Sequence, residues 1–215
     1  KAVTTGQGDS GDTDVIFLKG IGQKHQGLEI EGSMKLNDMI RLDGAVSFGK
    51  WKFDGDADGL YTEYAEDAPK QTSYTYTLDG LYVGDQPQTA YVLGTTLTPM
   101  DGLRLQGIFK MYDKNYADWS PDSRELSGDA DRSQVWQAPA YNRLDLHAAY
   151  KLPKIAGYDM TLTGHLFNAL DAVYVQDAVD NSQYNGFGDK LHLAHNAEVF
   201  LGTPRYFNLG LTVNF

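Results

Sequence analysis

Three aspartates in a short acidic stretch are the residues best spaced for chemistry. Asp54, Asp56 and Asp58 alternate along the chain and are followed by Gly59, which matches the first six positions of a calcium loop, D-x-D-x-D-G. Oxygen ligands at that spacing suit Ca²⁺. The twelfth position is Ala65 rather than a bidentate Glu, so the pattern is incomplete. The sequence therefore leaves two interpretations, a calcium site in a loop and a solvated acidic loop tip.

Aromatic side chains form a second candidate site, for binding rather than for reaction. Aromatic rings above a pore stack on ligands, but they also pack within loops or line a membrane interface. Both interpretations apply to the aromatic residues around segments 113–140 and 171–202. The candidate substrate-binding residues are Tyr112, Tyr116, Trp119, Trp136, Tyr174 and Gln183.

The sequence carries no catalytic signature. It has no cysteine, and it contains no nucleophile elbow, phosphate loop or HExxH motif. His192 and His195 have a spacing that brings two side chains together only on a helix, and none is expected there. A formal net charge of -11 argues against nucleic acid as a partner. We therefore expect neither an enzyme nor a resident cofactor, apart from calcium in the acidic loop.

The elements that must position these residues are predicted by alternation of apolar and polar residues, the pattern of a strand with two different faces. The clearest case is 207–215, where odd positions are apolar and even positions are polar or Gly. Similar patterns predict strands over 28–36, 40–48, 90–97, 103–111, 143–152, 160–166 and near 15–21. These make about eight strands, most of them long enough to cross a bilayer when tilted.

The predicted connections differ in length in a regular way. Short ones lie at 37–38, 99–102 and 153–157, and long acidic ones run over 54–86, 113–140 and 171–202. Tight turns at one end and large loops at the other are typical of an outer-membrane barrel, with its periplasmic turns and extracellular loops. The faces opposite the apolar ones are rich in charged residues and His, which suits a wet lumen. A soluble sugar-binding β-sandwich, with the apolar faces buried between two sheets, is a further interpretation.

The last strand carries a resemblance to a known family. Gly210, Val213 and the terminal Phe215 are similar to the assembly signal read by the outer-membrane insertion machinery. The segment 199–215 resembles the last strand of TonB-dependent receptors, in which a Gly-x-Pro-Arg-x-aromatic element leads into the strand. Here that element reads GTPRYF over 202–207.

Upstream segments resemble the same family. The pair 142–150 and 162–174 is similar to its penultimate hairpin, with Asn168 and Asp171 in the N-x-x-D motif. Segments 83–89 and 116–121 are most similar to the subgroup that has a carboxypeptidase-regulatory-like domain at its N-terminus. The resemblance covers about 24–215 of the chain.

The resemblance implies a fold and a function together. It implies an all-β, antiparallel transmembrane β-barrel, of which residues 1–215 are the C-terminal part of a single domain. About eight strands of a barrel of about 22 would lie here, with the plug and the N-terminal strands outside this chain. The implied activity is energised import of a nutrient across the outer membrane of a Gram-negative bacterium. The alternative is a small eight-stranded barrel serving as an anchor or adhesion protein.

The implied partners follow from that setting. They are outer-membrane lipid and lipopolysaccharide, the protein's own plug domain, TonB acting through the part outside this chain, and the barrel-assembly machinery. A surface lipoprotein caps the barrel in one branch of the family. The sequence does not identify the substrate.

Overall fold

Strands dominate the chain. A computed structural model describes residues 2–7, 13–64, 68–121, 124–125, 131–154, 157–182 and 191–214. Besides strands and the loops between them, these residues contain a three-residue 3-10 helix, η2 (Ala194–Asn196). No helix in the described ranges is long and apolar enough to cross a membrane.

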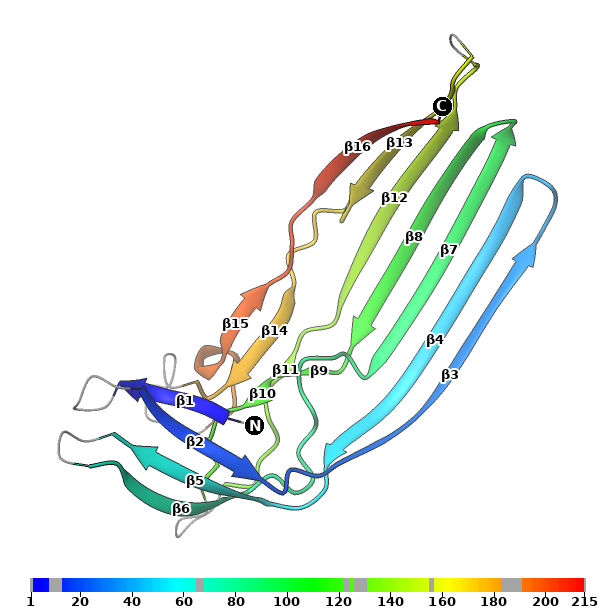
Figure 1. Ribbon diagram of the computed structural model, residues 1–215. Helices are drawn as coiled ribbons and strands as arrows, with labels where there is room; N and C mark the ends of the chain where they lie inside the picture. Colours follow the sequence, from blue (N-terminus) through cyan, green and yellow to red (C-terminus); the bar gives the residue numbers. More distant parts are fainter. Residues whose placement is uncertain are drawn as a thin grey trace.

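Seven strands form one large sheet, which we call the wall (Figure 1). Its order is β16-β13-β12-β8-β7-β4-β3, and every neighbouring pair is antiparallel. The strands are β3 (Gln23–Lys35), β4 (Ile40–Phe53), β7 (Thr89–Met100), β8 (Leu103–Asp113), β12 (Tyr141–Lys151), β13 (Asp159–Phe167) and β16 (Tyr206–Asn214). The predicted all-β antiparallel fold is confirmed.

The two ends of the wall differ as the connection lengths predicted. Three short connections, β3 to β4, β7 to β8 and β12 to β13, lie together at what we call the turn end (Figure 1). In the first of them the Asn37 side-chain oxygen accepts hydrogen bonds from the backbone N–H groups of Met39 and Ile40, at 2.9 and 2.8 Å. In the second, Gly102 has a φ of 78°, which favours glycine. The opposite end, where the long connections lie, is the loop end.

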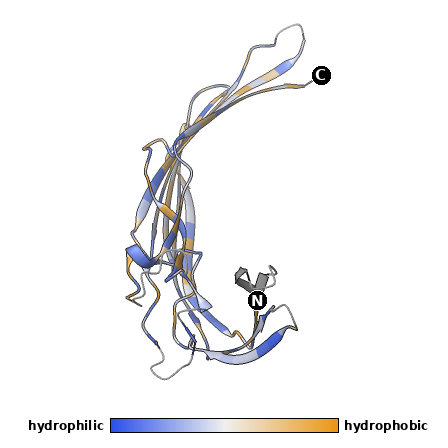
Figure 2. Cartoon of the chain, turned by 90° about the vertical axis from the view of Figure 1, so that its left-hand side faces the viewer, coloured by the Kyte–Doolittle hydropathy of each residue, from blue (hydrophilic) through white to orange (hydrophobic). Residues whose placement is uncertain are grey.

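One face of the wall is apolar and exposed. The strand register places Ile30, Val46, Tyr91 and Met111 in one cross-strand row, and Leu93 and Phe109 opposite each other in the next. Leu93 is 56% exposed and Leu209 is 73% exposed, although both are large and apolar. No second sheet covers this face in the described part of the chain, and Figure 2 shows the wall edge-on as a single curved layer. The β-sandwich interpretation is therefore wrong.

The opposite face is polar. It carries Arg41, Asp43, Arg104, Lys110 and His147, among others, and it bears a hollow of about 550 Å³ lined mainly by charged and small residues. Successive residues on each strand thus lie on opposite faces of the wall, one apolar and one polar, as the alternation of apolar and polar residues in the sequence requires.

The strand predicted near 15–21 is present as β2 (Thr13–Lys19), but it is not part of the wall. It pairs with β5 (Ala57–Glu63) in a four-stranded sheet that also contains β1 (Ala2–Gln7) and β6 (Lys70–Tyr76). The β3–β4 hairpin continues into this sheet through a bend in which the Asp54 N–H donates to the Gly22 carbonyl at 3.0 Å. A Cβ at Gly22 would lie 2.7 Å from the Asp54 carbonyl oxygen, so the close approach requires glycine.

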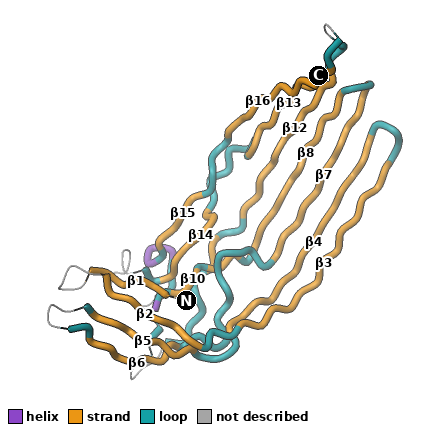
Figure 3. Tube along the Cα trace, viewed as in Figure 1, coloured by secondary structure: helices purple, strands orange, loops and turns teal. Residues whose placement is uncertain are grey.

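Two smaller sheets complete the loop end (Figure 3). One contains β10 (Asp118–Trp119), β14 (Val175–Asp180) and β15 (Glu198–Leu201), and the other pairs β9 (Asn115–Tyr116) with β11 (Gln137–Ala138). The hydrophobic core of buried side chains lies at the loop end, and Phe53, the last residue of β4, joins it to the wall. This core consists of Ile16, Leu18, Phe53, Ala57, Tyr76, Leu78, Leu81, Trp119 and Val135.

Candidate functional site at the loop end

Three tyrosines gather at the loop end of the wall. The Tyr112 ring lies 5.1 Å from that of Tyr141, and the Tyr141 ring stacks on that of Tyr174 at 4.3 Å. The guanidinium of Arg143 lies over the Tyr174 ring, and its Nη1 donates to the Tyr174 hydroxyl at 3.1 Å. The structure thus brings two of the predicted binding residues, Tyr112 and Tyr174, into one cluster. Tyr174 is only 5% exposed, so its ring packs against protein, and the ligand-binding role expected of it stays a prediction.

The aromatic residues of the 113–140 segment divide into two groups. Tyr116 is half-buried and stacks on Tyr82 at 4.2 Å, with the Lys52 ammonium 4.5 Å from the Tyr82 ring. Trp119 is 3% exposed and packs against the rings of Phe53 and Tyr76. Its large apolar ring completes the core, and the ligand-stacking role expected of it stays a prediction. Trp136 is half-buried, while Gln183 lies outside the described residues.

The three aspartates predicted to bind calcium lie in different settings. Asp56 is already engaged, because its Oδ2 accepts from Arg132 Nη2 at 2.8 Å and its Oδ1 accepts from the backbone N–H groups of Leu78 and Asp79 at 3.0 Å. Asp58 lies on β5, where its Oδ1 accepts from the Thr75 hydroxyl at 3.2 Å. Asp54 is exposed, and no three acidic or His side chains converge on a metal position within the described ranges.

The Arg132 guanidinium holds the pKa of the Asp56 carboxyl below its ordinary value, although partial burial acts in the opposite direction. Asp56 is therefore an ionised side chain that joins segment 54–56 to segment 78–79 and to Arg132. Asp54 and Asp56 lie in the bend between β4 and β5, whereas Asp58 lies on β5. Calcium binding by these residues stays a prediction.

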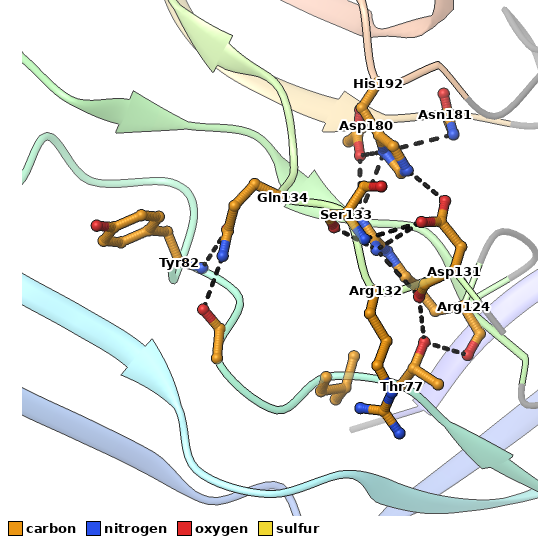
Figure 4. Close-up of polar contacts among 12 residues, drawn as sticks. Thr77, Tyr82, Arg124, Asp131, Arg132, Ser133, Gln134, Asp180, Asn181 and His192 are labelled. Carbon is orange, nitrogen blue, oxygen red and sulfur yellow. Dashed lines mark hydrogen bonds and ion pairs between the residues drawn. The ribbon is translucent and has the colours of Figure 1, made fainter.

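A buried ionic network joins two long connections and was not predicted (Figure 4). Arg124 and Asp180 are fully buried, at 0% exposure each, with Arg124 Nη2 3.5 Å from Asp180 Oδ2. Arg124 Nη1 also donates to the Ser133 carbonyl at 2.6 Å. The imidazole of His192 bridges two carboxylates, because its Nδ1 contacts Asp180 Oδ2 and its Nε2 lies 2.5 Å from Asp131 Oδ2. We call these four side chains the loop-end network.

The network also reaches a third connection. The Thr77 hydroxyl donates to the carbonyl of Asp131 at 2.7 Å and to that of Arg124 at 3.2 Å. Thr77 is thereby held to Arg124 and Asp131, which in turn contact Asp180 and His192. In the sequence, His192 stands out only through its spacing from His195. In the structure the His192 imidazole instead contacts Asp131 and Asp180, which are 61 and 12 residues away.

The charge on His192 depends on pH. Burial acts to lower the pKa of His192, but the hydrogen bonds to the Asp180 and Asp131 carboxylates outweigh it, so the pKa lies above the ordinary 6.5. Burial acts to raise the pKa of Asp131, yet the bond to His192 leads to a net decrease below 3.8. Both ring nitrogens of His192 face a carboxylate, an arrangement that favours the protonated imidazole, and the Arg124 guanidinium lies beside it.

We expect the loop end to loosen as the pH rises through the folded-state pKa of His192. A group whose pKa is raised on folding contributes its full stability below its unfolded pKa, about 6.5, and loses it above the folded value. The check is the ratio of proteinase K cleavage rates in the His192→Asn variant and the wild type, measured from pH 6 to pH 9. The ratio should fall towards one with increasing pH, and a ratio that stays constant would rule out a charged His192.

The two family-like motifs near the C-terminus contact one another. Asn168 is 1% exposed with a φ of 48°, and its side chain accepts from the Ala172 N–H at 3.0 Å and donates to the Thr203 carbonyl at 3.2 Å. The Arg205 N–H donates to Asp171 Oδ1 at 3.0 Å. The turn that holds the N-x-x-D motif therefore fixes the segment that leads into β16.

Asp145 ties this turn to the wall. Its carboxylate is 2% exposed, and it accepts from Lys110 Nζ at 2.9 Å and from the Asn168 N–H at 2.9 Å. Gly202 lies on the other side of the turn, where its N–H donates to the Tyr174 carbonyl at 2.9 Å. A Cβ at Gly202 would overlap the Tyr174 ring, so glycine is required for this packing.

We expect Gly202→Ala to displace the Tyr174 ring and destabilise the folded barrel by about 1–3 kcal/mol, the usual cost of overpacking. The urea midpoint of unfolding in lipid vesicles measures this effect. Gly32→Ala is the matched control, because a Cβ at Gly32 meets no atom within 4 Å. Equal midpoints for the two variants would contradict the packing described here.

The candidate assembly-signal residues lie on the edge strand β16. Gly210 is opposite Thr163, and the Thr163 hydroxyl donates to the Gly210 carbonyl at 3.3 Å. Val213 pairs with Met160 near the turn end. Phe215 lies outside the described residues.

A model of the family described as TonB dependent receptor-like, beta-barrel matches residues 2–169 of the 215. No curated protein matches the chain at a significant level.

Proposed function

Since this chain belongs to the TonB-dependent receptor β-barrel family, we propose that it forms part of the wall of an outer-membrane transporter that imports a nutrient. The family is one of transporters of the Gram-negative outer membrane and not of enzymes. The nutrient itself is not specified by the residues described above.

One observation carries this proposal, the single-layered wall with its exposed apolar face and its charged opposite face. An apolar face that no protein layer covers is stable when hydrocarbon covers it. We propose that the charged face, with the hollow that Arg41, Asp43 and Arg104 line, borders a water-filled lumen that holds the plug domain.

The unpaired edges of the wall support a larger barrel. Within the described residues, β3 and β16 each have a neighbour in the wall on one side only. Unpaired backbone groups in hydrocarbon cost several kcal/mol each, so both edges require further strands. We propose that this wall closes with such strands into a barrel of about 22, around the protein's own plug.

The orientation follows from the two ends of the wall. We propose that the turn end faces the periplasm, where TonB contacts the plug and where the assembly machinery reads the β16 signal. The loop end then faces lipopolysaccharide and the medium. We propose that Tyr112, Tyr116 and Trp136 contribute to ligand capture there, because they are only half-buried. A surface lipoprotein over this end is part of the same proposal.

The test is uptake by cells that lack the gene encoding this chain. Deletion should abolish energised uptake of at least one solute from a defined mixture, measured as depletion of the medium. The wild-type gene should restore that uptake, but not in a strain without TonB. Localisation of the full-length protein to the inner membrane, or uptake of every solute unaffected by deletion, would contradict the proposal.

A further inference from the structure

Two histidines lie side by side on the polar face of the wall. His147 on β12 and His165 on β13 are cross-strand partners, and their Nδ1 atoms are 2.9 Å apart. Their ring centroids are 5.0 Å apart, and both side chains are partly exposed. The position is therefore accessible from the face that carries the charged residues.

Amide side chains flank this pair along the cross-strand row, and the Phe167 ring lies 5.4 Å from that of His147 and 6.0 Å from that of His165. The register places Gln106 on β8 opposite His147 and Asn208 on β16 opposite His165, so four polar side chains form a row across four strands. The Gln106 amide nitrogen donates to the Thr96 hydroxyl at 3.3 Å. The Gln106 and Asn208 side chains add amide oxygens to the two imidazoles of the row.

The nearest carboxylate of the same face is already neutralised. Asp145, two residues from His147, accepts a hydrogen bond from Lys110 Nζ at 2.9 Å and is almost fully buried. The pair therefore presents imidazole nitrogens rather than carboxylates as its strongest ligands, a donor set that suits Cu²⁺, Ni²⁺ or Zn²⁺ and not Ca²⁺ or Mg²⁺.

The distance between the two imidazoles is close to what one ion requires. Zinc–nitrogen bonds of about 2.0–2.1 Å at a tetrahedral angle place two ligand nitrogens about 3.3 Å apart. The observed 2.9 Å between the Nδ1 atoms needs an opening of only a few tenths of an ångström, which small side-chain rotations supply. An ion would replace the single proton that now joins the two rings.

We propose that His147 and His165 form a binding site for a divalent transition-metal ion of this kind on the luminal wall. Water, Gln106 and Asn208 complete its coordination. The site goes beyond the proposed function, because it needs only that this face contact water. A receptor that imported none of the solutes tested would still bind the ion.

The experiment uses the full-length receptor, purified in detergent without a histidine tag. Binding of Zn²⁺ is measured by titration calorimetry, and Cu²⁺ is observed by electron paramagnetic resonance, which reports coordinated nitrogens. His147→Ala and His165→Ala should each lower the affinity at least about tenfold, since loss of even an indirect partner of a metal costs about 10–100-fold. His25→Ala is the matched control, because His25 lies on the same face and stacks on Trp51 at 5.3 Å.

A further variant keeps the test valid if an alanine variant does not fold. His147→Gln retains a hydrogen-bonding side chain opposite His165 but removes the imidazole ligand, and heat-modifiable electrophoretic migration verifies its folding. The inference is upheld if this variant loses the ion and His25→Ala keeps it. Absence of binding to the wild type at micromolar ion concentrations, or binding that survives in His147→Gln and His165→Ala, would overturn it.

Discussion

Replacing Arg124 by methionine is expected to detach two long connections from one another and to destabilise the loop end by about 3–5 kcal/mol, the usual cost of removing one partner of a buried ion pair. Arg124 and Asp180 are both fully buried, so the variant leaves the Asp180 carboxylate with His192 alone. It also leaves the Ser133 carbonyl without the donor 2.6 Å away. The wall does not contain this network, so the barrel itself should remain folded.

Limited proteolysis of intact receptor in vesicles checks this expectation, with heat-modifiable migration reporting the barrel. Cleavage in the loops should become at least about a hundredfold faster if local opening of the loop-end network governs the rate of proteolysis. Arg132→Met is the matched control, since Arg132 is 52% exposed in its pair with Asp56 and solvent screens such a surface pair. Equal cleavage of the two variants would show that the network does not hold the loops.

A single arginine on the apolar face of the wall is expected to destabilise the barrel by about 2–4 kcal/mol, the cost of a cation near the bilayer midplane. Leu93 is the position of choice, because it lies near the middle of β7, is 56% exposed and faces Phe109 and Gly44 across the neighbouring strands. Ile108→Arg is the matched control on the polar face, where Ile108 borders the luminal hollow opposite Asp145.

Urea titration of the receptor in vesicles measures both variants. Leu93→Arg should lower the free energy of unfolding by the stated amount, while Ile108→Arg should change it by less than about 1 kcal/mol, as is usual for luminal and surface sites. If the two substitutions lower the free energy of unfolding equally, the two faces contact the same surroundings, and the assignment of the lipid face is wrong.

The strands of the wall could be predicted from the sequence because each one has a single environment on each face. Apolar residues such as Leu209 and Leu211 then alternate strictly with polar ones, and this local signal needs no knowledge of the neighbouring strands. The strands at the loop end lack that signal. β10 has only two residues, and its parallel pairing with β14 joins Asp118 to Val179, which no local pattern indicates.

The contacts at the loop end were less predictable, because they join residues that lie far apart in the sequence. The partners in the loop-end network are separated by up to 68 residues, as for Arg124 and His192, and a single sequence does not show which distant charges meet. The setting of the acidic stretch could not be predicted, because spacing alone does not reveal that Arg132 pairs with Asp56 from 76 residues away. The burial of Trp119 could not be predicted either, because it depends on Phe53 and Tyr76, from two other strands.

The central claim is that hydrocarbon covers the apolar face of the wall and that water covers the other. The chain has no cysteine, so single cysteines placed one at a time over 90–97 of β7 can each carry a spin label in the receptor in vesicles. We predict that labels at 91, 93, 95 and 97 collide mainly with oxygen dissolved in lipid, and that labels at 90, 92, 94 and 96 do not show this preference. The claim would be contradicted if oxygen accessibility did not alternate between successive positions of β7, or if the labels at odd positions were shielded from oxygen.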